Sequence, residues 1–389
     1  MIPIDDSIFE EAYAFYAYLH RHPELSFREY GTSAYIKRIL VENAIPFRPV
    51  GETGIIAWLG DISRENKGGK IIGFRADTDA LPVTENPSHA LCSEYEGVMH
   101  ACGHDMHTAI VLALAIRLKR EGVKTGILFL FQHGEETLPG GASDFCRDEF
   151  FSIHRPDCIF ALHADPDIPL YKVGICSGEY TASGDEVYIK LSGKGGHAAM
   201  PHLTSNLLLA ASHLITALQQ VNGRLAPVSI PSVLTFGNIR CDGRMNIIPK
   251  EVLLEGIFRT FDEKWRICAK KDIERIAVSV ARAYGAGCEV NIIPGYPMTV
   301  NDPELSELVG KRICGIWGEE SLIRLEKRMT TDDFAYYSQS MPALYMRLGV
   351  NSGPDSGGRL HTPDFYPDPA ALKTGVDVLY TVYSLIVDL

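Results

Sequence analysis

Four strand candidates in the first half of the chain, several of them nearly continuous apolar runs, constrain its fold more than any other feature. Runs of this kind suit strands that are buried on both faces of a mostly parallel sheet. Amphipathic segments alternate with them, which is the pattern of βαβ units. We therefore expect strands at 54–59, 70–76, 126–132 and 158–162, and helices at 7–21, 32–43, 106–121 and 142–150.

The pattern changes near residue 180, where the stretch from Val187 to Leu191 alternates with a period of two, as in a half-exposed antiparallel strand. The following residues predict the order β-α-β-β-α-β of a split ferredoxin-like unit, which can form a separate domain. After Pro294 the βα pattern resumes. The predicted fold is an α/β domain of residues 1–180 and 294–389, with a mostly parallel mixed sheet sandwiched by helices, interrupted by an inserted α+β ferredoxin-like domain of residues 181–293.

Ionisable residues follow three of the predicted strands. Asp79 lies shortly after the strand 70–76, Glu135 and Glu136 follow the strand 126–132, and His163 follows the strand 158–162. In open α/β sheets the carboxyl ends of the strands form the edge where ligands bind. Each residue has an ordinary structural explanation on its own, but their coincidence at one edge predicts a functional site.

Cys102 and His104 precede the helix 106–121, which we expect Asp105 to cap. Sulfur, nitrogen and carboxylate ligands from several loops, with one spare carboxylate, suit a two-metal hydrolase. Such ligands fit Zn, Mn, Co or Ni, and the sequence does not choose among these metals. A rival mechanism would use Cys102 as a thiol nucleophile paired with His104, but it gives Glu136, His163 and His361 no role.

Composition excludes several other classes of protein. The formal net charge of -12 argues against a nucleic-acid partner. Nine cysteines without regular spacing argue against a disulfide framework. The acidic N-terminus lacks the pattern of a signal peptide, and no uncharged apolar run is long enough to predict a membrane span. We expect a soluble cytoplasmic protein.

Seven motifs occur in order along nearly the whole chain. They resemble the aminoacylase/hippurate-hydrolase branch of the dinuclear metallopeptidase superfamily that includes carboxypeptidase G. The segment from His100 to Asp105 is the most specific. The motifs are His20-Arg-His-Pro-Glu-Leu25, Arg75-Ala-Asp-Thr-Asp-Ala-Leu-Pro82, His100-Ala-Cys-Gly-His-Asp105, Gly134-Glu-Glu136, Gly195-Gly-His-Ala198, Asn246-Ile-Ile-Pro249 and Leu360-His-Thr-Pro363.

The resemblance implies a catalytic domain with a two-metal site and an inserted lid or dimerisation domain. Cys102 is placed where other branches use a bridging aspartate, Glu135 becomes the general base, and Asp79 supports the metal site. A general base fits the chemistry independently, because a carboxylate that binds no metal can pass a proton from water to the leaving amine. The implied ligands of two divalent metal ions are Cys102, His104, Glu136, His163 and His361.

For the inserted domain, the resemblance implies roles for three further residues. His197 stabilises the oxyanion, typically in the active site of the partner subunit, so a homodimer is expected. Asn246 and Arg259 grip the free α-carboxylate of the substrate. The chain departs from the family pattern at Thr330-Thr-Asp-Asp-Phe334, where relatives usually have Gly-Ser-Glu-Asp-Phe, and in the tail at 364–368. Asp332 is shorter than the glutamate of relatives, and both departures bear on the substrate more than on the chemistry.

The predicted function is a metal-dependent amidohydrolase that cleaves N-acyl amino acids, with N-acetyl or aryl-acyl groups, into a carboxylic acid and a free amino acid. The alternative is a metallo-dipeptidase or exopeptidase that acts on small peptides. Two other classes remain: a metal-containing binding protein without catalysis, against which Glu135 and His197 argue, and a zinc-stapled structural protein, which would need clustered Cys/His spacing.

Overall fold

The computed structural model describes residues 6–63, 70–353 and 358–389. The chain divides into two compact units. Unit 1 comprises Met1–Tyr180, Thr299–Lys327 and Asp332–Leu389, and unit 2 comprises Thr181–Met298 and Arg328–Thr331. The second unit therefore interrupts the first in sequence. The domain boundaries that the sequence analysis expects, at residues 180 and 294, stay a prediction.

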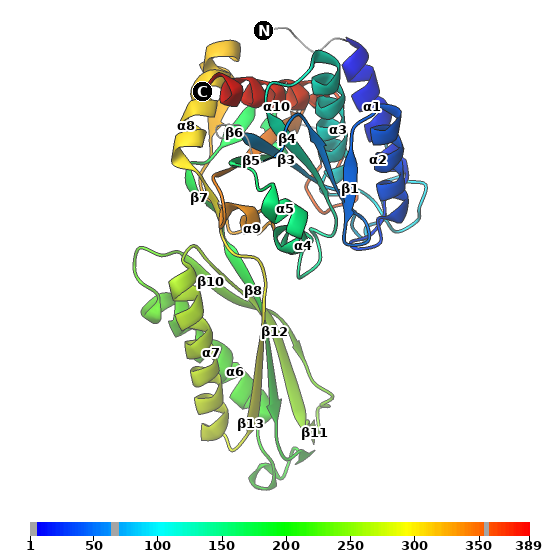
Figure 1. Ribbon diagram of the computed structural model, residues 1–389. Coiled ribbons are helices and arrows are strands. Elements are labelled where there is room, and N and C mark those ends of the chain that lie inside the picture. The colour runs from blue at the N-terminus through cyan, green and yellow to red at the C-terminus, as the bar shows by residue number, and fades with distance from the viewer. Residues whose placement is uncertain (1–5, 64–69, 354–357) are drawn as a thin grey trace. The chain divides into compact units, whose positions relative to one another are not determined.

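Unit 1 is built on an eight-stranded mixed sheet with the order β1-β2-β4-β3-β5-β16-β6-β15 (Figure 1). The pairs β3–β4, β3–β5, β5–β16 and β6–β15 are parallel, and the pairs involving β1 and β2 are antiparallel. The remaining pair of neighbouring strands, β6–β16, is antiparallel. The strands are β1 (Phe47–Val50), β2 (Gly54–Leu59), β3 (Ile71–Asp77), β4 (Gly126–Gln132), β5 (Cys158–Pro169), β6 (Val173–Ile175), β15 (Leu322–Arg324) and β16 (Ala343–Asn351).

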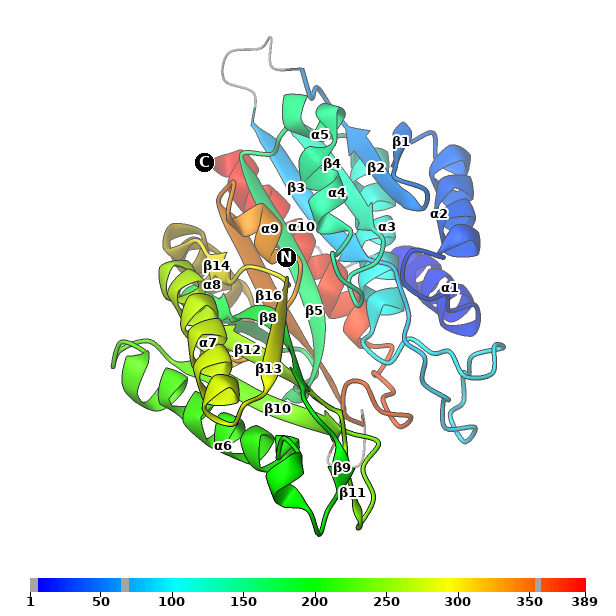
Figure 2. The ribbon, with the colours of Figure 1, turned by 90° about the horizontal axis from the view of Figure 1, so that it is seen from below.

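Helices cover both faces of this sheet, which explains why every residue of β3 and β4 is buried (Figure 2). One core lies between the sheet and helices α1, α2, α3, α8 and α10, and a second core lies on the opposite face with α4, α5 and α9. This is the predicted α/β sandwich. The helices are α1 (Asp6–Arg21), α2 (Tyr30–Glu42), α3 (His104–Glu121), α4 (Ala142–Arg147), α5 (Glu149–Ile153), α8 (Pro303–Trp317), α9 (Ala335–Ser338) and α10 (Ala371–Asp388).

Unit 2 has a four-stranded antiparallel sheet with the order β10-β12-β8-β13. The apolar residues of β8 and β12 pack with those of helices α6 and α7 in a core of their own. Burial alternates along β8 and β13, as expected of strands with one covered face. The elements follow the predicted ferredoxin-like order: β8 (Ser183–Ser192), α6 (Leu207–Gln220), β10 (Ser232–Arg240), β12 (Glu251–Thr260), α7 (Glu263–Ala283) and β13 (Gly287–Pro294).

Smaller elements complete the chain. In unit 2, a two-stranded ribbon pairs β9 with β11. A second ribbon pairs β7 with β14. Within the described ranges, no helix combines the length and the apolar composition that crossing a bilayer requires. The remaining elements are β7 (Gly178–Thr181), β9 (Gly196–His197), η1 (Pro201–Leu203), η2 (Val221–Leu225), β11 (Ile247–Ile248), β14 (Thr299–Asn301) and η3 (Glu319–Ser321).

Candidate metal centre

Helix α3 begins at His104, two residues earlier than predicted, and Asp105 does not cap it. The N-cap is Gly103, whose φ of 86° lies in the left-handed region that favours glycine. The Asp105 carboxylate instead accepts a hydrogen bond from Nδ1 of His20 at 2.6 Å. The expected cap was wrong because Gly103 turns the chain into the helix sooner. Because the helix begins at His104, both His104 and His107 lie in its first turn. Residues three apart in a helix share one face.

The ring of His104 is fully buried and oriented by Asp79. Nδ1 of His104 donates to Oδ1 of Asp79 at 3.1 Å, which leaves Nε2 as the unprotonated nitrogen of the neutral ring. Nε2 has no hydrogen-bond partner among the described residues and lies 3.8 Å from Oε1 of Glu136. Burial disfavours the charged ring, but Asp77 and Asp79 outweigh it and raise the pKa of His104 to about 10. The surroundings of Nε2 therefore favour a cation.

Cys102 and His163 face each other across the site. Sγ of Cys102 lies 3.3 Å from Nε2 of His163. Nδ1 of His163 donates to the backbone carbonyl of Ala164 at 2.7 Å, so the lone pair of Nε2 points at the sulfur. Burial, followed by the charge of Arg347, holds the pKa of His163 well below its usual range, and burial with Glu136 raises the pKa of the Cys102 thiol. A thiolate here requires a cation beside it.

Glu136 connects this group to His361 near the end of the chain. Nε2 of His361 lies 3.3 Å from Oε1 of Glu136, and the backbone amide of Glu136 donates to Oδ2 of Asp79 at 2.9 Å. His361 has a φ of 62°, which is strained for a residue with a side chain. Its backbone amide donates to the carbonyl of Ala101 at 2.8 Å and thereby ties the segment to the Cys102 loop.

The predicted metal ligands form two groups that share Cys102. In one group the ligand atoms of Cys102, His104 and His163 lie within 4.8 Å of one another, and in the other those of Cys102, Glu136 and His361 do so. The orphaned Nε2 of His104 and the buried thiol among carboxylates are the features that bound cations would satisfy. The donor set would fit two divalent ions, with Cys102 in both groups of candidate ligands.

Glu135 belongs to two groups of ionisable side chains: it has a carboxylate oxygen within 4.8 Å of ligand atoms of His104 and Glu136, and one within 4.8 Å of carboxylate oxygens of Asp332 and Asp333. It is buried and belongs to a cluster with Asp332 and Asp333. Burial raises the pKa of Glu135 well above its usual range, and the charges of Asp332 and Glu136 raise it further. A carboxyl in such surroundings holds a proton more readily than an exposed one, as a proton carrier must.

The sequence reasoning did not assign roles to Asp77, His107 or Arg75. Oδ1 of Asp77 accepts from Nδ1 of His107 at 2.6 Å, and the buried guanidinium of Arg75 contacts Oδ2 of Asp77 at 2.6 Å and Oδ1 of Asp333 at 2.7 Å. Nε2 of His107 accepts the backbone amide of Ala164 at 2.8 Å. The position of His107, three residues after His104, could have indicated that His107 belongs to the site.

The remaining predicted residues lie in unit 2. His197 is in β9 and pairs with Ile247 of β11, and the amide of Ala198 donates to the carbonyl of Asn246 at 3.1 Å, so His197 and Asn246 are neighbours. Nδ1 of His197 accepts the amide of Ala199 at 3.1 Å, which places the proton of the neutral ring on Nε2. Arg259 lies on β12, separate from this ribbon in sequence and sheet.

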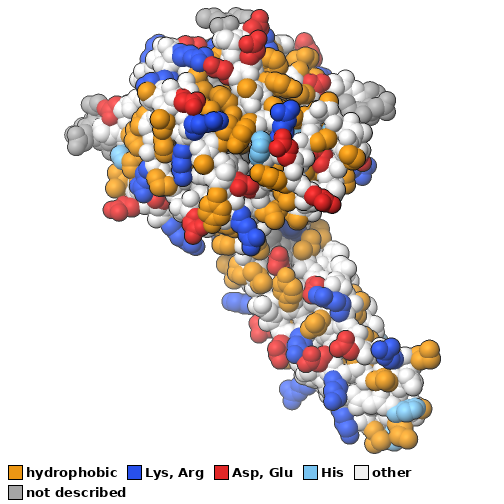
Figure 3. Space-filling view, turned by 90° about the vertical axis from the view of Figure 1, so that its right-hand side faces the viewer, with side chains coloured by type: hydrophobic (Ala, Val, Ile, Leu, Met, Phe, Trp, Pro, Cys, Tyr) orange, Lys and Arg blue, Asp and Glu red, His pale blue; other side chains and the backbone are white. Residues whose placement is uncertain are grey.

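The surface around His197 is unusually apolar. Met200, Leu203, Met245 and Ile247 are all exposed, and Met245 is 100% exposed. Figure 3 shows hydrophobic and histidine side chains together at this end of unit 2. An exposed apolar patch of this kind is typical of an interaction surface.

Arg259 is half-buried, and its Nε has no hydrogen-bond partner among the described residues. Burial lowers the pKa of Arg259. A Cβ at Gly184, which pairs with Arg259 across the sheet, would come within 2.5 Å of Nη1. The guanidinium therefore occupies space that only glycine leaves open.

A comparison with known protein families identifies the family of this chain. Residues 73–384 match the model of peptidase family M20/M25/M40. The chain belongs to this peptidase family. The resemblance seen in the sequence and the predicted fold class are thus confirmed, and the chain is a metal-dependent hydrolase of the family.

Three relatives illustrate the range of this family. The N-acetyldiaminopimelate deacetylase of Bacillus licheniformis is 35% identical and covers 94% of this chain and 96% of its own. The N-acetyl-L-cysteine deacetylase of Bacillus subtilis is 34% identical over 95% of this chain and 87% of its own. A solved structure of a dinuclear metal-binding peptidase of the family from Bacillus subtilis has a TM-score of 0.81 and 29% identity, covering 98% and 99% of the two chains.

Proposed function

We propose that this chain is a two-metal amidohydrolase that cleaves N-acyl amino acids into a carboxylic acid and a free amino acid. The observation that carries the proposal is that Cys102 belongs to both groups of candidate ligands. The two deacetylases among the relatives act, by their names, on N-acetylated amino acids, which supports the substrate class. The relative described as dinuclear supports two ions per chain.

In this proposal Cys102, His104 and His163 hold one ion, and Cys102, Glu136 and His361 hold the other. When bound, two divalent cations polarise the amide carbonyl and lower the pKa of the attacking water. Asp79 orients the ring of His104 through the hydrogen bond at Nδ1. The thiolate, imidazole and carboxylate donors suit zinc or manganese, with cobalt and nickel as further candidates.

Glu135 is the proposed general base. It takes a proton from the attacking water and returns it to the nitrogen of the leaving amine. Its burial beside Asp332 and Asp333 supports this role, because these surroundings stabilise the protonated form between the two transfers.

His197, Asn246 and Arg259 are proposed to act on the substrate from unit 2. The proton on Nε2 of His197 is available to an oxyanion, because Nδ1 already accepts a backbone amide. The unpartnered Nε of Arg259 suits the free α-carboxylate of an amino acid, which a guanidinium binds through two parallel hydrogen bonds. Asn246 would contribute an amide beside His197.

A homodimer is part of the proposal, with His197 serving the partner subunit. The exposed apolar side chains around His197 support a protein partner at this end of unit 2. We also propose a cytoplasmic location. All nine cysteines are free, which supports a reducing compartment.

The test is elemental analysis of the purified chain together with hydrolysis of N-acetyl amino acids, N-benzoyl amino acids and dipeptides, before and after chelation. We expect about two metal ions per chain and cleavage of acyl amino acids that chelation abolishes and added metal restores. Faster cleavage of dipeptides would favour the metallo-dipeptidase alternative. Undiminished hydrolysis by a metal-free chain would instead favour Cys102 as a thiol nucleophile.

A further inference from the structure

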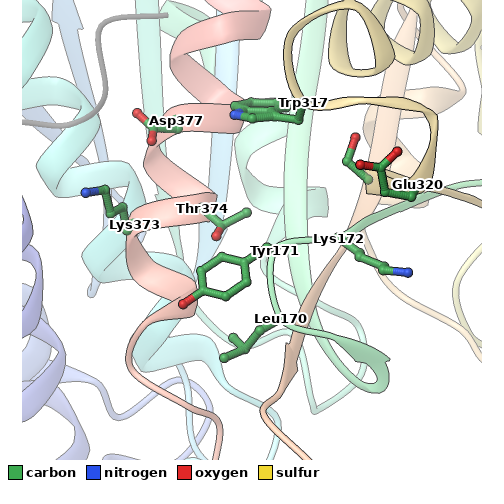
Figure 4. Close-up of a pocket in the computed structure, with 9 residues that line it drawn as sticks. Leu170, Tyr171, Lys172, Trp317, Glu320, Lys373, Thr374 and Asp377 are labelled. Carbon is green, nitrogen blue, oxygen red and sulfur yellow. The ribbon is translucent and has the colours of Figure 1, made fainter.

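Unit 1 has a cavity of about 470 Å³ between the β5–β6 turn, the end of α8 and the first turns of α10 (Figure 4). The ammonium groups of Lys172 and Lys373 point away from its central space in Figure 4, so nothing directs these charges at one ligand. A group with better-defined contacts lies elsewhere in unit 1. The carboxyl group of Glu29, which directly precedes α2, contacts the segment that carries the proposed general base.

Glu29 is fully buried, and three neutral donors hold its carboxyl group. Oε1 accepts the backbone amides of Phe27 at 2.9 Å and Gly134 at 2.8 Å, and Oε2 accepts the hydroxyl of Thr53 at 2.8 Å. Burial of a polar group is unfavourable unless hydrogen bonds compensate for the lost water, and these bonds do so. Because Gly134 directly precedes Glu135, they also connect Glu29 to the proposed general base.

Glu29 occupies the N-cap position of α2, but its side chain does not cap that helix. An acidic side chain at this position can accept an amide of the first turn. Glu24 does so instead, because its carboxylate accepts the backbone amides of Gly31 at 2.9 Å and Thr32 at 2.7 Å. The side chain of Glu29 therefore serves the Gly134 segment and not its own helix.

The contact joins two residues whose backbones are left-handed. Phe27 has a φ of 62°, and Gly134 has a φ of 61°. The ring of Phe27 packs on Gly134, where a Cβ would come within 2.6 Å of Cζ of the ring. A left-handed backbone is strained for a residue such as Phe27, so the surrounding structure must hold it. One oxygen of Glu29 accepts both amides and thereby fixes the two backbones against each other.

A second carboxylate holds the other end of the same segment. Oδ2 of Asp79 accepts the backbone amide of Glu136 at 2.9 Å and the hydroxyl of Ser26 at 2.7 Å. The residues on both sides of Glu135 are therefore anchored, Gly134 by Glu29 and Glu136 by Asp79.

We propose that Glu29 is a positioning residue for Glu135. This inference rests on the proposed function, because it requires Glu135 to act as the general base. By holding the amide of Gly134, Glu29 fixes the backbone from which the side chain of Glu135 extends. A general base must lie within hydrogen-bond reach of the proton that it takes, and a displacement of about 1 Å can lower the rate by about a hundredfold. Loss of the Glu29 carboxyl group should therefore lower kcat with little change in KM.

The experiment is a double-mutant cycle on the full-length, metal-loaded chain with Glu29→Ala, Glu135→Gln and the two changes together. We measure kcat with the N-acetyl or N-benzoyl amino acid that the parent chain cleaves fastest. Glu29→Ala should lower kcat by about tenfold to a hundredfold in the parent chain, but by less than about twofold once residue 135 is glutamine. Equal fold-losses in the two backgrounds would overturn this role alone. A parent chain that hydrolyses none of the substrates would overturn the proposed function and this role together.

Glu29→Gln tests whether the hydrogen bonds suffice. Burial, followed by the charge of Asp79, raises the pKa of Glu29, so its carboxyl group resembles an uncharged amide more closely than an exposed one does. The amide oxygen of glutamine can accept both backbone amides, and its NH₂ group can donate to the hydroxyl of Thr53. We expect a kcat within about threefold of the parent value, since the hydrogen bonds are kept. A loss as large as that of Glu29→Ala would contradict positioning through these bonds.

Glu24→Ala is the matched control. It also removes a carboxylate that accepts two backbone amides, but those amides belong to α2. It should lower the midpoint of thermal unfolding and change kcat by less than about twofold, because the cap stabilises the helix only. A loss of kcat equal to that of Glu29→Ala would overturn the inference. Should Glu29→Ala fail to fold, Glu29→Asp takes its place in the cycle, since the shorter side chain withdraws its oxygens from Gly134.

Metal content separates positioning of the base from damage to the metal centre. Asp79 holds the amide of Glu136, so the Glu29 variants should keep the metal content of the parent chain. Elemental analysis of the preparations used for the kinetics checks this. Loss of metal in Glu29→Ala would show that Glu29 acts through the ligand Glu136, and the proposed role toward Glu135 would be wrong.

Discussion

Sγ of Cys102 lies 3.3 Å from Nε2 of His163, although the two residues are 61 positions apart in the chain. Cys102 comes from the loop before α3, and His163 comes from β5, so the contact joins a helix start to the middle of the sheet. The same sulfur also belongs to the group that contains Glu136 and His361. One atom therefore connects all the candidate ligands, and its removal should affect both metal positions.

Cys102→Ala is expected to weaken the binding of both metal ions, whereas His361→Ala removes a ligand from only one group. We expect the first variant to lose both ions during dialysis and the second to keep about one ion per chain. Metal content after dialysis, measured by elemental analysis, checks this contrast. Equal losses in the two variants would show that Cys102 is not shared.

The adjacent glutamates should behave differently when each loses its charge. Glu135→Gln should keep its metal and lose activity by about a hundredfold to ten-thousandfold, as expected for a general base. Glu136→Gln should lose metal as well as activity. Metal content and kcat, measured on the same preparations, distinguish the two roles. Full activity of the Glu135→Gln variant would exclude Glu135 as the general base.

Gly184→Ala should act on the substrate through Arg259. The added Cβ would come within 2.5 Å of Nη1 of Arg259 and 2.8 Å of Cγ2 of Thr331, so the guanidinium must move. We expect KM to rise by about tenfold with little change in kcat, because a binding contact is lost equally in the ground and transition states. The control is an acyl amino acid amide, which lacks the carboxylate and should show no such rise.

Asp185→Asn should destabilise unit 2. The buried carboxylate pairs with Arg266 at 2.8 Å and Lys270 at 3.0 Å, and removing one partner of a buried pair costs about 3–5 kcal/mol. Asp272→Asn, in the exposed pair with Arg275, should cost less than about 1 kcal/mol. Chemical denaturation followed by circular dichroism compares the two variants. Similar losses would mean that the buried pair contributes no more than the exposed one.

The pKa of Asp185 also predicts how the stability of unit 2 depends on pH. Burial raises the pKa of this carboxyl, but Arg266 and Lys270 outweigh burial and lower it below its usual value. A lowered pKa in the folded state gives stability that is complete above about pH 4 and is lost as the pH falls through the folded value. Acid titration of the unfolding free energy should show a smaller decline below about pH 4 in Asp185→Asn than in the parent chain.

Sequence reasoning located most of the regular structure, since long periodic segments carry their own pattern. The predicted strands 54–59 and 126–132 agree with β2 and β4 residue for residue. The short strands β1, β6 and β15 were not predicted, because a few residues at a sheet edge carry too little pattern. The early start of α3 was missed because it follows from the left-handed backbone of Gly103, which the hydrophobic pattern does not reveal.

The candidate site was predictable where residues follow strands and less so where they act on one another. Glu136 and His163 could be placed at one sheet edge by the strand-end rule. The pairing of Asp77 with His107, and of Arg75 with Asp333, depends on contacts between distant segments.

The place of β16 in the sheet has a consequence for synthesis on the ribosome. β16 (Ala343–Asn351) lies between β5 and β6, which are made far earlier in translation. Until β16 emerges, β5 and β6 expose unpaired edges while the whole of unit 2 is being added. Exposed strand edges invite wrong pairing between nascent chains. Chaperones that shield such edges should therefore matter most for this protein between the synthesis of β6 and that of β16.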